Sequence, residues 1–445
     1  MVFGPPIWYN KHMNVLLFLI IILAFIVCIG ILNEKLFHLQ SDIALILFSL
    51  VIALLLMGAD RLFDWPILHD FIGRVGEFGF EKYLMDGVLC FMLFAGASKV
   101  NMGKFKQNLR PICLLAFLTT AISSVIYGLL FFAVAMLFHI PVDIWMCILL
   151  GCVVSPTDPI AATGILSKIG LSKNVCSVIE NESLFNDGTG VTLFVFVRSI
   201  VIHSGEDNFV ILMCKEIVGA VAVALLVSFV LFSLMKTTKD PVRYILISLF
   251  DVALVYIICE ELGFSGVIAS VVCGMYFSYA MDQMERRVCV IDPKEYYKDF
   301  WEILENILNA VLFVMIGLYV FDVEISSYAA VVIPAAIVIL LLSRVIGVLI
   351  STLLGGRRIP GNYDLREFVV LMVWSALKGG LSLALAIQTE AFLSPEVYRI
   401  FINVTYVTIF FSVLVQGLTI RKVYFKLEEH KAARTRQDGR KESGC

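Results

Sequence analysis

The chain has 445 residues, of which 60% are hydrophobic and only 16% are charged, and its mean hydropathy is +0.92. A composition this apolar excludes an ordinary soluble domain and indicates an integral membrane protein. The formal net charge of −3, and the lack of a basic stretch interleaved with aromatic residues, give no reason to expect a nucleic-acid partner.

Continuous apolar runs of roughly 17 to 25 residues recur along the chain, which is the length that a helix needs to cross about 30 Å of hydrocarbon. The strands of a membrane barrel would instead show short alternating segments. The sequence therefore predicts an all-α membrane protein with about thirteen spans. They are expected at residues 13–32, 41–59, 83–98, 111–138, 142–168, 174–203, 209–235, 242–260, 264–281, 301–321, 326–353, 366–389 and 396–420.

The loops between these spans alternate in charge, and short basic loops are typical of the cytoplasmic side. The basic loops contain Lys99, Lys104, Lys106 and Arg110, then Lys168 and Lys173, then Lys236, Lys239 and Arg243, and then Arg357, Arg358 and Arg366. The acidic loops contain Glu206 and Asp207, Glu260 and Glu261, Asp322 and Glu324, and Glu390 and Glu396. We expect a multi-pass protein of the plasma membrane with its N-terminus outside and its C-terminus in the cytoplasm.

Two spans are interrupted. The fifth contains two prolines and an aspartate in SPTDP (155–159), and proline breaks a helix because it lacks a backbone donor. The twelfth contains a lysine and two glycines in ALKGG (376–380). The breaks lie seven spans apart, so the chain divides into two six-helix halves of opposite orientation, with the span at 209–235 as a linker. Such paired breaks are the best sequence indication of a transporter's binding site.

Charged residues at membrane depth usually face the protein interior and mark a pathway. We expect Asp158 to balance the positive end of a half-helix and Lys378 to offset a negative end. Simpler interpretations remain open, because Asp158 could form a turn and Lys378 could extend its ammonium group towards the interface.

The stretch VIENESLFNDGTG (178–190) contains three further acids. On a helix, Glu182 and Asn186 are four residues apart, as are Ser183 and Asp187, so their oxygen atoms share one broad face. Hard monovalent cations prefer oxygen ligands. Since a desolvated carboxylate can hold a proton or a cation but not comfortably both, competition at this face predicts cation/proton exchange. Glu180 is expected outside the site, and a purely structural role for the acids stays open.

Three other functions are considered. K+/H+ exchange would use the same residues, and a passive cation channel would need no titratable site. An intramembrane aspartyl protease needs two membrane aspartates, but the second lies here in Asn186-Asp187-Gly188 and not in a Gly-x-Gly-Asp segment. The eleven cysteines form no CxxC pair or zinc-like cluster, so we expect no metal centre, disulfide or cofactor beyond the transported ions.

Thr157-Asp158-Pro159 followed by Glu182–Thr189 resembles the sodium/proton antiporters of the first cation/proton antiporter family, the NhaP and eukaryotic exchanger type. Further stretches extend the resemblance over nearly the whole chain: Glu261–Ala269, Phe300–Gly317 and Ser382–Ala386. The family usually has Gly-Leu-Arg-Gly where this chain has Ala376–Gly379, so that Lys378 replaces an arginine.

The resemblance implies that Asp187 is the carboxylate that alternates between a proton and Na+ or Li+. The other implied cation ligands are Asp158, Thr157, Glu182 and Ser183, and the implied supporting residues are Asn186, Arg344 and Lys378. Members with an Asn-Asp pair are generally electroneutral, with one cation exchanged per proton.

The resemblance also implies a homodimer in which a core domain moves against a dimerisation domain, as an elevator. The expected segments are residues 1–110 (dimerisation-domain helices 1–3), 111–203 (core helices 4–6), 204–240 (linker helix 7), 241–322 (dimerisation-domain helices 8–10), 323–420 (core helices 11–13) and 421–445 (a short cytoplasmic tail). The tail is polar and mixed in charge, so we predict a solvated or headgroup-associated end.

Overall fold

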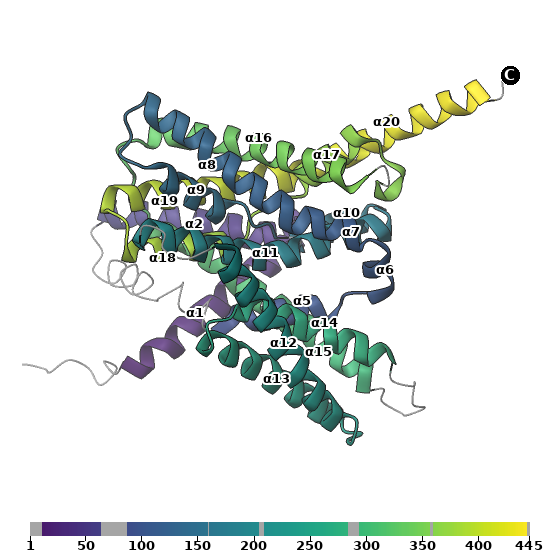
Figure 1. Cartoon of the computed structure of the whole chain (residues 1–445). Coiled ribbons are helices and arrows are strands. Elements are labelled where there is room, and N and C mark those ends of the chain that lie inside the picture. The colour runs from purple at the N-terminus through teal and green to yellow at the C-terminus, as the bar shows by residue number, and fades with distance from the viewer. Residues whose placement is uncertain are drawn as a thin grey trace, which may run out of the picture. The chain divides into compact units, whose positions relative to one another are not determined.

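The computed structural model describes residues 11–63, 87–158, 160–203, 209–283, 293–356 and 359–442. Regular secondary structure within these ranges is entirely helical (Figure 1). Nine helices among the described residues are long and apolar enough to cross a membrane, and two shorter apolar helices accompany them. The chain is therefore an all-α, multi-pass membrane protein, as predicted.

The α-helices follow one another with few long connections. In chain order they are α1 (Lys11–Leu32), α2 (Ser41–Phe63), α5 (Leu89–Ser98), α6 (Met102–Gln107), α7 (Leu109–Cys113), α8 (Thr120–Leu137), α9 (Ile144–Val154), α10 (Ile160–Lys168), α11 (Lys173–His203), α12 (Phe209–Met235), α13 (Pro241–Glu261), α14 (Gly266–Gln283), α15 (Pro293–Leu318), α16 (Ala329–Gly355), α17 (Leu365–Trp374), α18 (Gly380–Gln388), α19 (Pro395–Phe410) and α20 (Leu418–Glu442). Within the described residues, π-helical segments also extend or join them, among them η1 (Asn33–Phe37), η3 (Leu114–Thr119) and η7 (Phe411–Gly417). The predicted span at 83–98 begins outside the described residues.

Both predicted interruptions are present. The chain leaves helical geometry between α9 and α10 and again between α17 and α18. Pro159, the second proline of the first break, lies outside the described residues. The half-helices begin at good caps, because Asp143 caps α9 through the Met146 amide and Asp364 forms a capping box with Glu367 at the start of α17. The half-helices before both breaks are therefore stabilised at their N-termini, and the interruptions are confined to the residues between the half-helices.

Loops that the charge alternation assigned to the same side of the membrane contact one another. Arg110 Nη2 donates to Leu354 O at 3.0 Å, which joins two basic regions of the chain. Arg399 Nε lies 2.6 Å from Glu324 Oε2, which joins two acidic loops. Several charges used in that prediction lie outside the described residues: Glu206, Asp207, Arg357 and Arg358.

Contacts divide the chain into two compact units. The first comprises residues 1–80 and 306–323 and contains α1, α2 and the end of α15. Gly317 on α15 allows a close approach to α2, because a Cβ atom at this position would overlap the Ser49 side chain. The small residue therefore sets the packing distance between these two helices.

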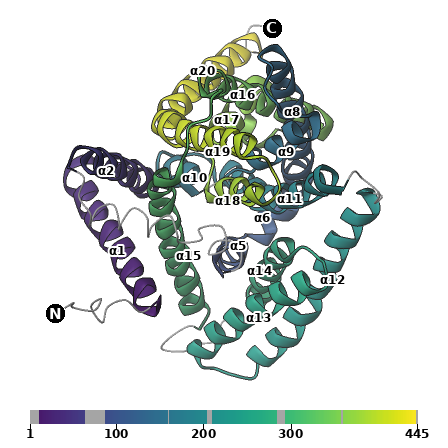
Figure 2. The same ribbon diagram turned by 90° about the vertical axis from the view of Figure 1, so that its left-hand side faces the viewer.

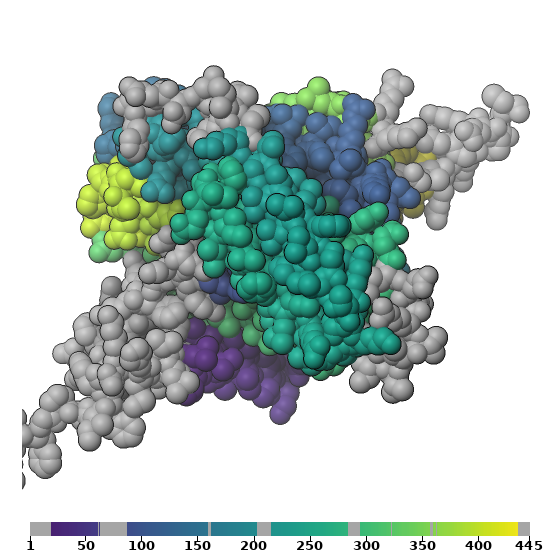
Figure 3. Space-filling model, turned by 60° about the horizontal axis from the view of Figure 1, so that its bottom comes forward, coloured from purple at the N-terminus to yellow at the C-terminus, as the bar shows by residue number. Residues whose placement is uncertain are grey.

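The second unit comprises residues 81–305 and 324–445. One group of its helices, α12, α13 and α14, packs together in Figure 2, and α5 and the first half of α15 share its core. Phe94, Phe277 and Trp301 form the aromatic centre of this core, with ring centroids 5.6 Å and 4.3 Å from that of Phe94. The outer surface of α12 and α13, visible in Figure 3, exposes large apolar side chains such as Phe229 and Phe250, as expected of a lipid-facing surface.

The other group contains α8, α9, α11, α16 and α19 (Figure 1). The remaining halves of the interrupted spans, α10, α17 and α18, pack against helices of this group. Gly128 on α8 and Gly151 on α9 bring these two helices into backbone contact. A side chain at Gly151 would overlap Ser124 O, and one at Gly128 would lie 2.5 Å from Ile148 Cα. Small residues thus fix the position of α9, which ends at the first break.

The C-terminal tail, predicted as a solvated or headgroup-associated end, is a helix with many exposed side chains that also makes contacts with the rest of the chain. Residues Leu418–Glu442 continue α19 and η7 as the helix α20, which packs on α10 and α17. His430 and Arg434 contact acidic residues at the start of α17. Some of the charged residues on which the prediction was based therefore form ion pairs within the protein.

Candidate functional site

The helix α11 presents the predicted face of oxygen atoms. It is continuous from Lys173 to His203, so Asn186 lies one turn after Glu182. Asn186 Nδ2 donates to Glu182 Oε1 at 2.9 Å. Both side chains are buried, as is Ser183. The amide therefore holds the Glu182 carboxylate in place on the helix.

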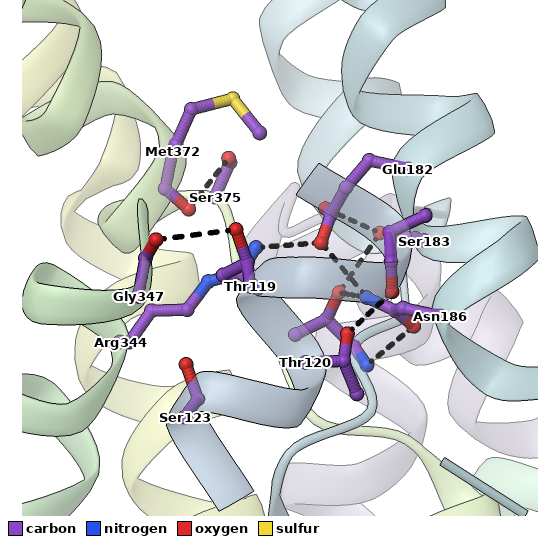
Figure 4. A network of polar contacts seen from close by, with 12 residues as sticks. Thr119, Thr120, Ser123, Glu182, Ser183, Asn186, Arg344, Gly347, Met372 and Ser375 are labelled. Carbon is purple, nitrogen blue, oxygen red and sulfur yellow. Dashed lines mark hydrogen bonds and ion pairs between the residues drawn. The ribbon is translucent and has the colours of Figure 1, made fainter. Parts of the chain in front are cut away.

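The first break brings Thr157 onto this face. The Thr157 amide donates to Asn186 Oδ1 at 3.1 Å, and Thr157 Oγ1 accepts from Asn186 Nδ2 at 2.6 Å. Thr157 Oγ1 also lies 3.0 Å from Ser183 Oγ (Figure 4 labels Ser183 and Asn186). Two hydroxyl oxygens and an amide thus form one polar cluster between the broken segment and α11. Hydroxyl oxygens of this kind are suitable ligands for a hard monovalent cation.

Glu182 forms a buried ion pair with Arg344 of α16. Arg344 Nη2 lies 2.9 Å from Glu182 Oε1, and the two side chains are 6% and 1% exposed (Figure 4). Within the described part of the chain, Arg344 Nε and Nη1 have no hydrogen-bond partner. Glu182 Oε2 has one long contact, 3.5 Å from Ser183 Oγ. The pair cancels two charges and leaves Oε2 directed at the hydroxyl cluster.

The two breaks cross each other. The Asp158 amide donates to Leu377 O at 2.8 Å, in an isolated antiparallel bridge. Gly379, the residue before α18, lies against Asp158, since a Cβ atom there would be 2.7 Å from Asp158 Oδ2. Asp158 therefore lies beside the N-terminal end of α18, where a negative charge is favourable.

Lys378 lies at a helix C-terminus, but at that of α9 in the other half of the chain. Its Nζ donates to Ser155 O and Pro156 O, both at 3.0 Å, and the residue is 3% exposed. These carbonyls follow the end of α9 and have no further turn of helix to bond to. The ammonium group thus satisfies two backbone acceptors that the first break leaves open.

Asp187 differs from the other acids. Its side chain is only partly buried, and among the described residues it makes no hydrogen bond or ion pair. It is nevertheless close enough to Asp158, Glu182 and Lys378 to interact with their charges. A carboxylate without a hydrogen-bond partner, close to two other acids, is available to bind a proton or a cation.

Sequence reasoning missed supporting residues that come from the last predicted span. Ser412 Oγ accepts a hydrogen bond from the Lys378 amide at 2.9 Å, and Gln416 Nε2 donates to Val373 O at 3.0 Å. Both side chains are buried in η7 and satisfy backbone groups around the second break. A serine and a glutamine at four-residue spacing in the apolar second half of this span were the available signal.

The model of the sodium/hydrogen exchanger transmembrane family matches residues 21–426. Among named relatives, the Na(+)/H(+) antiporter NhaP of Pseudomonas aeruginosa is 32% identical over 413 residues, which cover 88% of this chain and 93% of that protein. The Na(+)/H(+) antiporter NhaH of Halobacillus dabanensis is 26% identical, with 94% and 98% covered.

A solved structure has the same fold. The sodium proton antiporter MjNhaP1 from Methanocaldococcus jannaschii superposes with a TM-score of 0.74 at 19% sequence identity, over 93% of this chain and 99% of that one. The match to the family model covers most of the chain, including both breaks and α11. The chain therefore belongs to the sodium/hydrogen exchanger family, whose members are membrane transporters and not enzymes.

Proposed function

We propose that this protein exchanges Na+ or Li+ for H+ across a membrane, with proton and cation competing for Asp187. The observation that carries the proposal is the environment of this carboxylate, which makes no hydrogen bond or ion pair in the described structure and interacts with the charges of Asp158 and Glu182. It lies one helical turn after Ser183, whose hydroxyl meets that of Thr157 at the first break. The relatives NhaP and NhaH are Na(+)/H(+) antiporters, which supports the same conclusion. Family membership sets aside the intramembrane protease.

The proposed ligands lie on both sides of the first break. Asp158 and Asp187 supply carboxylates, Thr157 and Ser183 supply hydroxyl oxygens, and Glu182 Oε2 completes the set. Asn186, Arg344 and Lys378 hold these groups without binding the ion. Each ligand is a hard oxygen atom, as Na+ and Li+ require.

The charges at the site favour electroneutral exchange. The acids Asp158, Glu182 and Asp187 face two cations, Arg344 and Lys378, which leaves one negative charge. One proton or one monovalent cation neutralises it. A neutral, loaded site crosses the membrane interior at a lower cost than the charged, empty one, so the two gradients become coupled with one cation per proton.

We also propose how the domains move during transport and how the chains assemble. Residues 111–203 and 323–420 would move as a core against residues 1–110 and 241–322, with 204–240 as a linker, in a homodimer of the plasma membrane. The crossing of the breaks supports movement of the core as one body, because the Asp158–Leu377 bond ties its two halves together. The basic loops support a cytoplasmic C-terminus.

Purified protein in proteoliposomes tests the proposal, with a pH-sensitive dye inside and a series of cations added outside. We expect Na+ and Li+ to dissipate an imposed proton gradient, with a rate that does not change when a membrane potential is applied. Absence of any cation-dependent proton movement between about pH 6 and 9 would refute exchange, since removal from water makes a carboxylate bind its proton at higher pH than it does in water.

The same series separates the alternatives. Activity with K+ and Rb+ but not Na+ would identify a K+/H+ exchanger, and cation flux without proton movement would identify a passive channel. Asp187→Asn should abolish exchange, because an amide cannot take up the proton. Glu180→Gln is the matched control, since Glu180 lies on the same helix two turns away and is exposed.

A further inference from the structure

The helix α20 is fixed to the start of α17 by a cluster of charges, called here the tail contact: His430 and Arg434 of α20 with Asp364 and Glu367. Arg434 Nη1 lies 3.0 Å from Asp364 Oδ2 and 3.0 Å from Glu367 Oε2. His430 Nδ1 lies 2.9 Å from Glu367 Oε1. The Glu367 side chain is 3% exposed, so its ion pairs are shielded from solvent.

The two acids of the tail contact also start α17. Asp364 Oδ1 accepts from the Glu367 amide at 2.7 Å, and the Asp364 amide donates to Glu367 Oε2 at 2.8 Å. This capping box places both carboxylates at the positive end of the helix. Contacts from α20 therefore act on the groups that define where α17 begins.

The far end of α17 reaches the proposed transport site. The helix has ten residues, or about 15 Å at 1.5 Å per residue, and ends just before the second break. Gln416 of η7 bonds to Val373 near this end, and Ser412 bonds to Lys378. Because η7 and α20 are one continuous helical segment, the same segment contacts α17 at both ends.

A bound metal ion is a weaker interpretation of the cluster. Ligand atoms of Asp364, Glu367 and His430 lie within 4.8 Å of one another, and an imidazole with two carboxylates is a suitable donor set for a transition metal. However, Arg434 already contacts both carboxylates. The positive charge that a metal ion would supply to the two carboxylates is therefore supplied by Arg434 of α20.

The tail contact contains one histidine, His430, and histidine is the side-chain type that most readily exchanges a proton near neutral pH. The His430 side chain is 70% exposed, so protons reach it directly. The ionisable groups of the tail contact and next to it in sequence are Asp364 and Glu367 on α17, Tyr363 before it, and Glu428, Glu429, Lys431 and Arg434 on α20. The other helix packed against α20 is α10, whose last turn carries Lys168. A positive charge on His430 adds attraction to Glu367.

We propose that the tail contact positions α17, and with it the second break, and that protonation of His430 tightens it. His430 and Arg434 are thus positioning residues for exchange, which act through α17 and do not touch the ion. The effect on transport rests on the function proposed above, but the contact itself can be measured without transport.

Hydrogen exchange of the full-length protein in detergent measures the contact, after correction for the intrinsic pH dependence of amide exchange. We expect the amides of residues 424–434 in the unaltered protein to be about threefold to fivefold better protected at pH 6 than at pH 8, the range for a partly exposed ion pair. His430→Gln should show the pH 8 protection at both pH values, and His430→Arg the pH 6 protection at both. Equal protection of all three proteins at both pH values would overturn the proposal.

Arg434→Gln should lower this protection about fivefold or more at both pH values, because its partner Glu367 is buried. Lys426→Gln is the matched control, since Lys426 is an exposed cation on the same helix. Equal loss in the two variants would refute a specific contact. A change in protection on adding Zn2+ or EDTA would favour the metal interpretation and likewise overturn the ion-pair assignment.

Proteoliposome assays then test positioning. The unaltered protein should show a step in the apparent Na+ affinity with pH on the side that carries the C-terminus, and this step should disappear in both His430→Gln and His430→Arg. Retention of the step in both variants would refute the positioning role. Loss of all exchange by the unaltered protein, with protection as expected, would refute the proposed function and leave the tail contact standing.

Discussion

The buried ion pair between Glu182 and Arg344 gives a quantitative prediction for stability. We consider Glu182→Gln, Arg344→Gln and the double variant. Each single substitution leaves the other charge in the protein interior without its partner, and Arg344 already has two nitrogen atoms without hydrogen-bond partners in the described part of the chain. The double variant removes both charges and keeps similar side-chain volumes. We therefore expect each single variant to be less stable than the double variant.

The magnitude follows from the geometry. At an effective dielectric constant of about 20, opposite unit charges 2.9 Å apart attract each other by about 6 kcal/mol. Desolvation of the two groups offsets part of this attraction, and loss of one partner of a buried pair typically costs about 3 to 5 kcal/mol. The double variant should cost less than about 2 kcal/mol, since no unpaired charge remains.

Thermal unfolding of the purified variants in one detergent at one scan rate is the assay. The expected order of unfolding temperatures is unaltered protein, then double variant, then both single variants. Glu324→Gln is a matched control, because the Glu324–Arg399 pair is 68% and 38% exposed and should contribute about 1 kcal/mol or less. If the double variant is as unstable as the sum of the two single variants, the charges do not interact as described.

Three further outcomes are expected. Lys378→Met should reduce exchange more than tenfold while Lys378→Arg retains more of it, because Ser155 O and Pro156 O need a donor; vesicle assays at matched protein content decide this. Gly190→Ala should displace the first break, since a Cβ atom would overlap Pro156, and should lower the unfolding temperature by several degrees. Partial burial alone would raise the pKa of Asp364, but the Glu367 amide and Arg434 outweigh it and hold this pKa below its usual value. Its contribution to the tail contact is therefore present above about pH 4 and lost as pH falls through the lowered pKa, which hydrogen exchange of α20 at acidic pH can measure.

The fold was largely predictable because membrane insertion imposes simple rules on the sequence. Runs of apolar residues that cross the membrane have to be helical, and two closely spaced prolines inside such a run interrupt the helix because proline lacks a backbone donor. Two glycines alone do not, since α11 contains Gly188 and Gly190 and is continuous. The predicted range 209–235 coincides with α12, and the predicted breaks are present. The docking of α20 was not predictable in this way, because its contacts join residues more than sixty positions apart and a polar helix gives no hydropathy signal.

The site was predictable where its residues lie close together in sequence. Asn186 lies one turn from Glu182, so their contact follows from helix geometry alone. The partners of Lys378 could not be predicted in this way. The sequence indicates that this cation offsets the C-terminal end of a half-helix, but it does not indicate which half-helix. Only the crossing of the two breaks places Lys378 at α9, and the same crossing makes Ser412 and Gln416 neighbours of the site.

The crossing also has a consequence for the synthesis of the protein. Lys378 follows Ser155 and Pro156 by more than 220 residues, so it enters the membrane long after the carbonyls that it satisfies. An unpaired backbone carbonyl in hydrocarbon costs several kcal/mol, so the break needs another partner until Lys378 arrives, and water is one that can fill this role. We therefore expect the newly inserted first half to be hydrated at its break. The transport site is completed only when the second interrupted helix has inserted in the correct orientation, which couples ion-binding competence to the end of translation.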